Sequence, residues 1–220
     1  FAKMWKVDYE WLQGNFVKPE WMMKPGFTLA RWWAGVLDGK DGNDAIDNAG
    51  DSLKALVVIG NGITSTAQQA KVQEGLDALE LLVCVDPFVN DAAVITNKKD
   101  DVYLLPAATQ FEGSGTVVAT NRSGQWRSQV VKPLFESMPD HEILFELAKR
   151  IGFYDELTRT IRDADGKIEW PEAATHEIAN IIKTIGMTGW TPERLKRHQE
   201  NWDKFDEKTL MGKEGTDVAG

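Results

Sequence analysis

Two short motifs in the first half of the chain carry residues that could bind a nucleotide. Gly60-Asn61-Gly62 follows an apolar run at 53–59, and Asp86 ends a second apolar run at 81–85. Glycine allows close backbone approach and positive φ, and a helix that starts behind such a turn offers free amides to a phosphate. An acid at the end of the next strand can accept hydrogen bonds from a ribose hydroxyl or a guanine edge. Together the motifs predict a nucleotide-type ligand.

Each motif also has a purely structural interpretation. Gly-Asn-Gly occurs in plain turns, and Asp86 can cap the turn that continues into Pro87. The stretch 60–65 has no third glycine, so it is not a G-x-G-x-x-G fingerprint. This departure disfavours an ordinary NAD-binding domain.

The composition argues against several classes of function. Asp and Glu outnumber Lys and Arg by 34 to 25, which gives a net charge of −9 and argues against binding to a nucleic-acid backbone. No apolar run approaches the roughly 20 residues of a spanning helix, so we expect no direct membrane insertion. The single cysteine, Cys84, excludes a disulfide framework and a cysteine-based metal or iron–sulfur site built by this chain alone.

The cysteine and the histidines do not indicate a catalytic or metal-binding site. Cys84 lies within an apolar run and is expected to be a small core residue rather than a nucleophile. The histidines have no second His or Cys at metal-ligand spacing, so we expect solvated surface positions for all of them: His141, His176 and His198.

The order of the elements predicts an α/β protein. Apolar runs at 53–59 and 81–85 flank a helical pattern at 65–79, with Ser65 or Thr66 as its cap, and a shorter strand follows at 102–105. Strand, helix and strand form a βαβ unit, so we expect a doubly wound, mostly parallel sheet with strands buried on both faces. Beyond it the patterns predict a β-hairpin and a helical C-terminal part, in segments at 113–124, 139–150, 172–185 and 192–205.

The N-terminal region has a different character. Large aromatic residues crowd positions 1–37, with a short amphipathic helix expected around 28–37, and turn formers and acids follow as a surface loop at 38–52. The aromatic side chains fill either this chain's own core or an interface with other segments. We therefore divide the chain into a lead-in with an acidic loop, a ligand-binding α/β part, a hairpin segment and a helical part, with bounds 1–52, 53–110, 111–137 and 138–220.

Several of these stretches, taken in order, resemble the molybdopterin oxidoreductase family. The matching residues are Lys54–Asn61, Leu82–Phe88, Asp101–Ala107, Phe111-Glu112, Gly115-Thr116, Asn121-Arg122, Gln125-Trp126-Arg127 and Pro139–Gly152. The resemblance is strong over 53–153. Within the family, the aromatic N-terminal stretch and Gln125-Trp126-Arg127 are most similar to the large subunit of molybdenum- or tungsten-dependent formate dehydrogenases.

The resemblance implies a bis-(molybdopterin guanine dinucleotide) cofactor carrying tungsten or molybdenum, and interconversion of formate and CO2. It implies that the turn residues Gly60, Asn61 and Gly62 lie against one guanine dinucleotide, that Asp86 holds its guanine, and that Asn90 also contacts that nucleotide. It further implies two partners, the remainder of a catalytic subunit and an iron–sulfur electron-transfer subunit. Relatives of this kind favour a periplasmic location, with the cytoplasm as the alternative.

Two positions depart from the family pattern. Gly62 stands where the family often has Pro, and Lys98-Lys99-Asp100 replaces small apolar residues.

Other parts of the family's catalytic site are absent from this segment. The iron–sulfur cysteines, the Cys or selenocysteine metal ligand and the second dinucleotide site are expected outside this segment, which by itself should not turn over formate. The alternatives are a non-catalytic scaffold of the same fold, or another member of the family such as a nitrate or polysulfide reductase.

Overall fold

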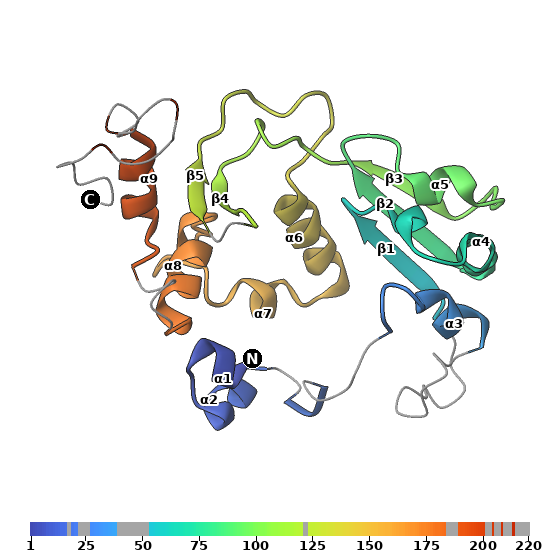
Figure 1. Ribbon diagram of the computed structural model, residues 1–220, viewed down its shortest axis with the longest axis horizontal. Coiled ribbons are helices and arrows are strands. Elements are labelled where there is room, and N and C mark those ends of the chain that lie inside the picture. The colour runs from blue at the N-terminus through green and yellow to red at the C-terminus, as the bar shows by residue number, and fades with distance from the viewer. Residues whose placement is uncertain are drawn as a thin grey trace. The chain divides into compact units, whose positions relative to one another are not determined.

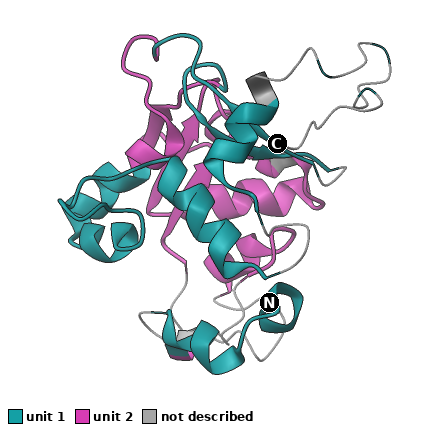
Figure 2. Cartoon of the chain, turned by 90° about the vertical axis from the view of Figure 1, so that its left-hand side faces the viewer, with its two compact units in different colours: residues 1–19, 110–132, 144–220 teal, residues 20–109, 133–143 magenta. Residues whose placement is uncertain are grey.

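The chain divides into two units, each built from several stretches of sequence. The computed structural model describes residues 1–16, 19–21, 27–38, 53–120, 123–183 and 189–200, with the single positions 204, 208 and 213. One unit comprises residues 20–109 and 133–143, and the other comprises 1–19, 110–132 and 144–220 (Figure 2). The expected acidic loop at 38–52 lies outside the described residues except for Asp38, and so does Asn121-Arg122.

A parallel sheet forms the centre of the first unit and confirms the α/β class. Its strands β1 (Ala55–Ile59), β2 (Leu81–Asp86) and β3 (Val102–Pro106) lie in the order β1-β2-β3 (Figure 1). The register aligns Val58 with Cys84 and Cys84 with Leu104. β-branched residues dominate β1, as expected for a strand, because their side chains pack well on a pleated surface.

Helices connect the strands and cover one face of this sheet. The 3₁₀ helix η3 (Ile63–Ser65) and α4 (Gln69–Ala78) link β1 to β2, and α5 (Asp91–Ile95) links β2 to β3. The core cluster combines side chains from these helices and strands with Trp32 and Val36 of α3 (Trp32–Leu37). Val72, Leu76 and Leu82 are fully buried in it.

The start of α4 differs from the sequence prediction. The helix begins at Gln69 behind Gln68, which has a left-handed backbone (φ 65°, ψ 53°). The hydroxyls of Ser65 and Thr66 instead donate to carbonyls of Gly62 and Ile63, each at 2.8 Å. Because these side chains stabilise the 3₁₀ turn, neither caps α4, and the expectation of a helix directly behind the glycine turn is wrong.

The other unit combines the predicted hairpin with short helices. Strands β4 (Gly115–Val118) and β5 (Gly124–Arg127) pair antiparallel. Helices α8 (Glu172–Ile181) and α9 (Pro192–Glu200) contact β4 and β5, respectively. The remaining helices are α1 (Ala2–Trp5), α2 (Tyr9–Gly14), α7 (Tyr154–Thr158) and the larger part of α6 (Asp140–Ile151); η1 (Pro19–Trp21) lies at the boundary between the units.

The predicted end of one helix, α6, and the predicted start of another, α9, are found close to their expected positions. Gly152 has a φ of 81° and directly follows α6, a conformation that suits glycine at the end of a helix. α9 begins at Pro192, and the Thr191 hydroxyl accepts a hydrogen bond from the Arg194 amide at 3.3 Å. The expected Pro and Thr at this helix start are therefore confirmed.

Close packing between α3 and α4 makes Gly75 sensitive to substitution. A Cβ added at Gly75 would lie 2.8 Å from the Trp33 Cβ, whereas one added at Gly14, the last residue of α2, meets nothing within 4 Å. We expect Gly75→Ala to lower the free energy of unfolding by about 1–3 kcal/mol through overpacking. The control Gly14→Ala should be neutral or stabilising by up to about 1 kcal/mol, because alanine favours a helix. Urea unfolding of both variants checks this, and equal effects would contradict it.

Candidate functional site

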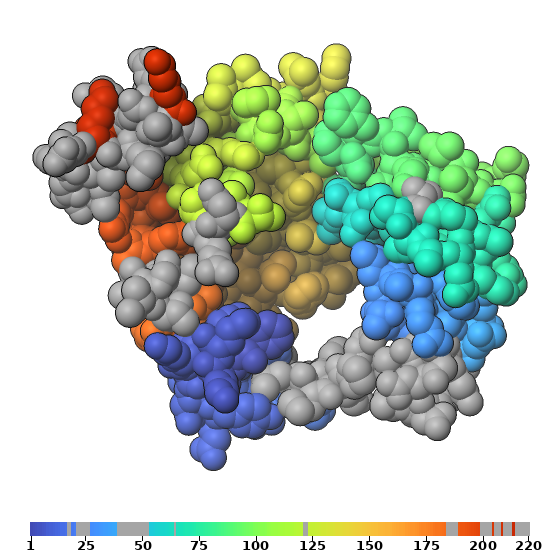
Figure 3. Space-filling view, viewed as in Figure 1, coloured from blue at the N-terminus to red at the C-terminus, as the bar shows by residue number. Residues whose placement is uncertain are grey.

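Parallel pairing brings the two predicted motifs to one edge of the sheet. Gly60 follows β1, Asp86 ends β2, and the Gly60 amide donates to the Val85 carbonyl at 2.9 Å. In the space-filling view, the cyan and green segments at this end of the sheet adjoin at the surface (Figure 3). The structure therefore brings together the residues that the sequence predicts as a site.

Asn90 is the residue that links the two motifs. Its side chain is buried, with 4% exposure, and its Nδ2 donates to the Asn61 carbonyl at 3.2 Å and to Asp86 Oδ2 at 3.1 Å. Its Oδ1 accepts from the Ala92 amide at 3.0 Å and so caps α5. One amide group thus holds the turn after β1, the acid at the end of β2 and the start of α5 in fixed relation.

Asp86 keeps acceptor capacity for a ligand. Its Oδ1 accepts from the Phe88 amide at 3.1 Å, and its Oδ2 accepts from Asn90. An ionised carboxylate has about four lone-pair sites, so these two contacts leave others available. A base edge with adjacent N–H donors would match the geometry of such a group.

The glycine turn exposes its backbone at the same edge. Gly60 has a φ of 54°, a region that favours glycine, and a Cβ added there would meet nothing within 4 Å. Asn61 and Gly62 are also exposed. The open space above Gly60 would accommodate a ligand that approaches the backbone closely.

The first turn of α6 adds two titratable groups that the sequence analysis did not assign to the site. The pKa of Asp140 is raised by burial and, secondarily, by the negative charge of Asp86. Burial lowers the pKa of His141 to about 4. The expectation that His141 is a solvated surface residue is therefore wrong. Residues 133–143 belong to the sheet unit, where Met138 donates to the Pro106 carbonyl at 3.2 Å and accepts from the Ala108 amide at 2.8 Å, and no sequence periodicity reveals this long-range pairing.

Cys84 and the remaining histidines carry no site among the described residues. Cys84 is 1% exposed, and burial raises the pKa of its thiol, which confirms a core residue. His176 is partly exposed, and its Nε2 lies 3.2 Å from Glu193 Oε1. Within the described ranges, no group of three or more His, Cys, Asp or Glu is arranged to hold a metal ion, and no helix is long and apolar enough to cross a membrane.

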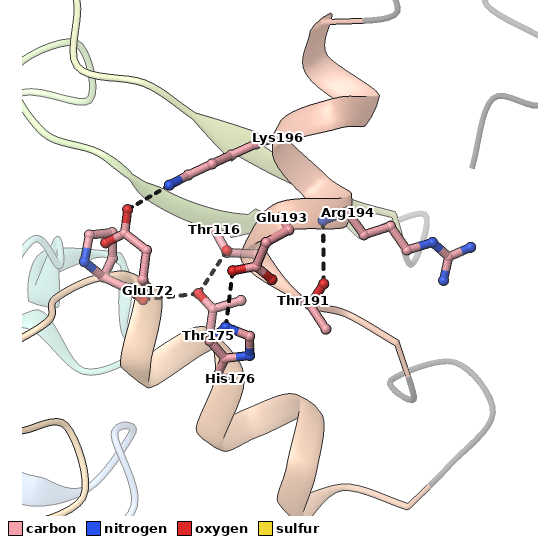
Figure 4. Close-up of polar contacts among 9 residues, drawn as sticks. Thr116, Glu172, Thr175, His176, Thr191, Glu193, Arg194 and Lys196 are labelled. Carbon is pink, nitrogen blue, oxygen red and sulfur yellow. Dashed lines mark hydrogen bonds and ion pairs between the residues drawn. The ribbon is translucent and has the colours of Figure 1, made fainter. Parts of the chain in front are cut away.

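A polar cluster in the other unit connects its hairpin to its C-terminal helices (Figure 4). The Thr116 and Thr175 hydroxyls lie 2.9 Å apart, and Lys196 pairs with Glu172 at 2.7 Å. The Lys196 ammonium also lies 4.5 Å from the ring centroid of the buried Trp126. These contacts join β4, β5, α8 and α9, so we interpret the cluster as structural.

An opening in the sheet unit lies away from the predicted site. It has a volume of about 550 Å³. Polar and small residues of α4, together with Leu37 and Asn97, line it: Ala70, Gln73, Glu74, Asp77 and Ala78. None of the predicted site residues contributes to this opening, and the Asp77 carboxylate already accepts from Thr96 and from the Asn97 amide at 2.9 and 2.6 Å.

The fold is an α/β fold with polar residues at the carboxyl edge of its parallel sheet, and a family match places the chain within a class of oxidoreductases. Residues 31–150 match the family described as molybdopterin oxidoreductase, so the chain belongs to that family. The match includes β1, β2, β3 and all the predicted site residues. The family assignment drawn from sequence resemblance is thereby confirmed.

Individual relatives include formate dehydrogenases. The chain is 31% identical over 192 residues to the F420-dependent formate dehydrogenase subunit alpha of Methanocaldococcus jannaschii, covering 84% of this chain and 26% of that protein. It is 26% identical over 162 residues to the formate dehydrogenase subunit alpha of Megalodesulfovibrio gigas, covering 67% of this chain and 16% of that protein.

Other similar proteins are not named as formate dehydrogenases. The NADPH-Fe(3+) oxidoreductase subunit alpha of Geobacter sulfurreducens is 27% identical over 176 residues, which cover 76% of this chain and 19% of that protein. The solved acetylene hydratase of Pelobacter acetylenicus is similar with a TM-score of 0.45 and 21% identity, over 66% of this chain and 19% of that one. The chain thus spans about a quarter or less of the curated relatives described here. These relationships do not bear on the compartment, so the periplasmic location stays a prediction.

We expect Asn90 to be important for stability as well as for the site. Asn90→Ala removes a helix cap and two side-chain hydrogen bonds, and should lower the free energy of unfolding by about 2–3 kcal/mol. Asn90→Thr retains a capping oxygen and should lose about 1 kcal/mol less. Urea unfolding measures both values, and two variants as stable as the wild type would contradict the geometry.

The burial of His141 predicts a specific pH dependence. Its pKa falls from 6.5 to about 4 on folding, so the unfolded chain binds more protons between these values, and the free energy of unfolding falls as pH falls through this window. We expect wild type to lose on the order of 2 kcal/mol more than His141→Gln between pH 7 and pH 4. Urea titrations at several pH values test this, because Asp140 is present in both proteins and its opposite contribution cancels. Parallel pH profiles would refute it.

Proposed function

We propose that this chain is a segment of a formate dehydrogenase catalytic subunit and helps to bind one arm of a bis-(molybdopterin guanine dinucleotide) cofactor. The observation that carries the proposal is the Asp86 carboxylate, held by Asn90 beside the open Gly60 turn at the carboxyl end of a parallel sheet. Ligands of open α/β folds bind at such edges. Two relatives named as formate dehydrogenase alpha subunits support the choice of reaction.

The residues present fit the guanine dinucleotide. Asp86 would accept from the adjacent N–H groups of the guanine edge, because its carboxylate retains lone pairs at the end of β2. The exposed backbone at Gly60, Asn61 and Gly62 would lie against the pyrophosphate. Asn90 would act on the nucleotide mainly by orienting Asp86 and the turn, since its own amide is engaged within the protein.

The chemistry of the reaction belongs to the cofactor. When bound, the tungsten or molybdenum centre with its pterins supplies the two-electron oxidation of formate to CO2, or the reverse reaction. In this proposal the chain contributes binding and orientation. The metal ligand, the iron–sulfur cluster and the second dinucleotide site come from the remainder of the catalytic subunit, and an iron–sulfur subunit carries the electrons.

Asp86→Asn tests the assignment directly. It places an amide N–H where guanine presents donors, and should reduce cofactor affinity about 10- to 100-fold. The matched control Asp100→Asn lies in the exposed loop before β3, at the opposite end of the strands, and should be neutral. The readout is the content of pterin dinucleotide and metal per protein. Mass spectrometry measures it on the polypeptide at its natural length. Equal cofactor content in both variants would refute a role of Asp86 in the site, whereas a natural-length wild type without any cofactor would favour the scaffold alternative.

A second candidate is another oxidoreductase of the family, and the NADPH-Fe(3+) oxidoreductase relative is the observation that favours it. Formate-dependent reduction of a viologen dye by the cofactor-loaded protein separates the two reactions. Turnover of formate supports a formate dehydrogenase. A loaded protein that is inactive with formate would retain the cofactor site but transfer electrons from another donor, and nitrate and polysulfide are then the acceptors to assay first.

A further inference from the structure

The turn after β1 contains the one Asn-Gly pair in the sequence, Asn61-Gly62. An asparagine side chain that precedes glycine cyclises readily, because glycine has no side chain to hinder the attack of its backbone nitrogen on the asparagine amide carbon. In a folded protein the reaction also depends on the exposure and the hydrogen bonds of the two reacting groups. Both residues are exposed, so the pair is accessible to the water that the reaction consumes.

The hydrogen bonds of this turn leave the two reacting groups free. The Asn61 carbonyl accepts from Asn90 Nδ2 at 3.2 Å, and the Gly62 carbonyl accepts from the Ser65 amide and hydroxyl at 3.3 and 2.8 Å. Among the residues that the structure describes, none forms a hydrogen bond with the Asn61 side chain or with the Gly62 amide. The backbone of the pair is thus held through its carbonyls, while the nitrogen and the side chain that must meet are unengaged.

The other described asparagines lack this combination, because none of them precedes glycine. The side chains of Asn15, Asn90 and Asn97 donate hydrogen bonds to other protein groups. Asn180 lies inside α8, where the backbone N–H groups point along the helix axis to carbonyls of the preceding turn. Asn61 is therefore the described asparagine best placed to react.

We propose that Asn61 is a site of spontaneous deamidation in the cofactor-free protein. The Gly62 nitrogen loses its proton and bonds to Asn61 Cγ, and the bond from Cγ to the side-chain nitrogen breaks to release ammonia. Water then opens the resulting succinimide ring at either carbonyl and leaves aspartate or isoaspartate at position 61. The balanced change consumes one water and releases one ammonia, and it needs no oxidant or reductant.

Either product weakens the candidate site. Each adds a negative charge to a chain whose net charge is already −9, in the turn that the proposed function places against a pyrophosphate. In isoaspartate the chain runs through the former side chain, so the carbonyl that accepts from Asn90 becomes part of a free carboxylate. This consequence rests on the proposed function, whereas the deamidation itself does not.

The rate of deamidation tests the modification. Cofactor-free polypeptide at its natural length is incubated in mildly alkaline buffer, and peptide mapping by mass spectrometry follows the conversion of each asparagine with time. Gly62→Ala is the matched control, because the Gly62 φ of −82° suits alanine and an added Cβ would lie 3.4 Å from Asp91 Oδ2, an ordinary contact.

We expect Asn61 to react at least about tenfold faster in the wild type than in Gly62→Ala, because the alanine methyl group hinders the attack. Asn61 should also react faster than Asn97, whose side chain is held by Asp77. Equal rates at Asn61 in the two proteins, or a wild type in which Asn61 reacts no faster than Asn97, would overturn the proposal.

Asn61→Asp reproduces one product and tests its consequence. Asn61→Gln is the control, because its side chain retains the amide without the charge. We expect Asn61→Asp at natural length to contain about fivefold less pterin dinucleotide per protein than Asn61→Gln, the effect of one repulsive charge near a phosphate. Equal content in these two variants, with a content lowered by Asp86→Asn, would overturn the consequence alone. Unchanged content in all three variants would instead count against the proposed site, and the deamidation of Asn61 would still stand.

Discussion

The burial of β2 against α4 is the interaction on which the rest of the sheet unit depends. Leu82 and Cys84 of β2, and Val72 and Leu76 of α4, are exposed by no more than 1%. Apolar burial of this kind provides most of the free energy that holds a βαβ unit together. Once β2 is fixed beneath α4, parallel pairing of β1 and β3 with it determines the register of the whole sheet.

The candidate site is a consequence of that register. Because β1 and β2 run parallel with Ile59 beside Val85, the turn after one strand and the acid after the other must meet at the same edge. The buried Asn90 side chain then hydrogen-bonds to both segments, because a buried amide needs partners among nearby protein groups. The internal hydrogen bonds at this edge do not use all the lone pairs of Asp86. That carboxylate and the exposed Gly60 backbone therefore remain accessible to a ligand.

Burial in the sheet depends on the strand. The central strand β2 is buried on both faces, with Leu82 and Cys84 on one and Val85 on the other, whereas the outer strands expose apolar side chains: Val57, Ile59, Tyr103, Leu104 and Leu105. The expectation of strands buried on both faces therefore holds for β2, which has a hydrogen-bonded neighbour on each side. In the other unit, by contrast, the contacts of Lys196 and Thr175 hold the hairpin and its helices together from within.

Local sequence patterns were sufficient to predict the parallel strands, the hairpin, α6 and the start of α9, because apolar runs, turn residues and the Thr191 and Gly152 helix ends act over a few neighbouring positions. The five-residue α5 was too short to produce a helical period. Other features depend on the three-dimensional fold: Asn90 contacts Asn61 across 29 positions, His141 is partly buried, and the outer strands expose apolar side chains while β2 is buried on both faces. These features arise from contacts between distant segments, and no local pattern of residues encodes them.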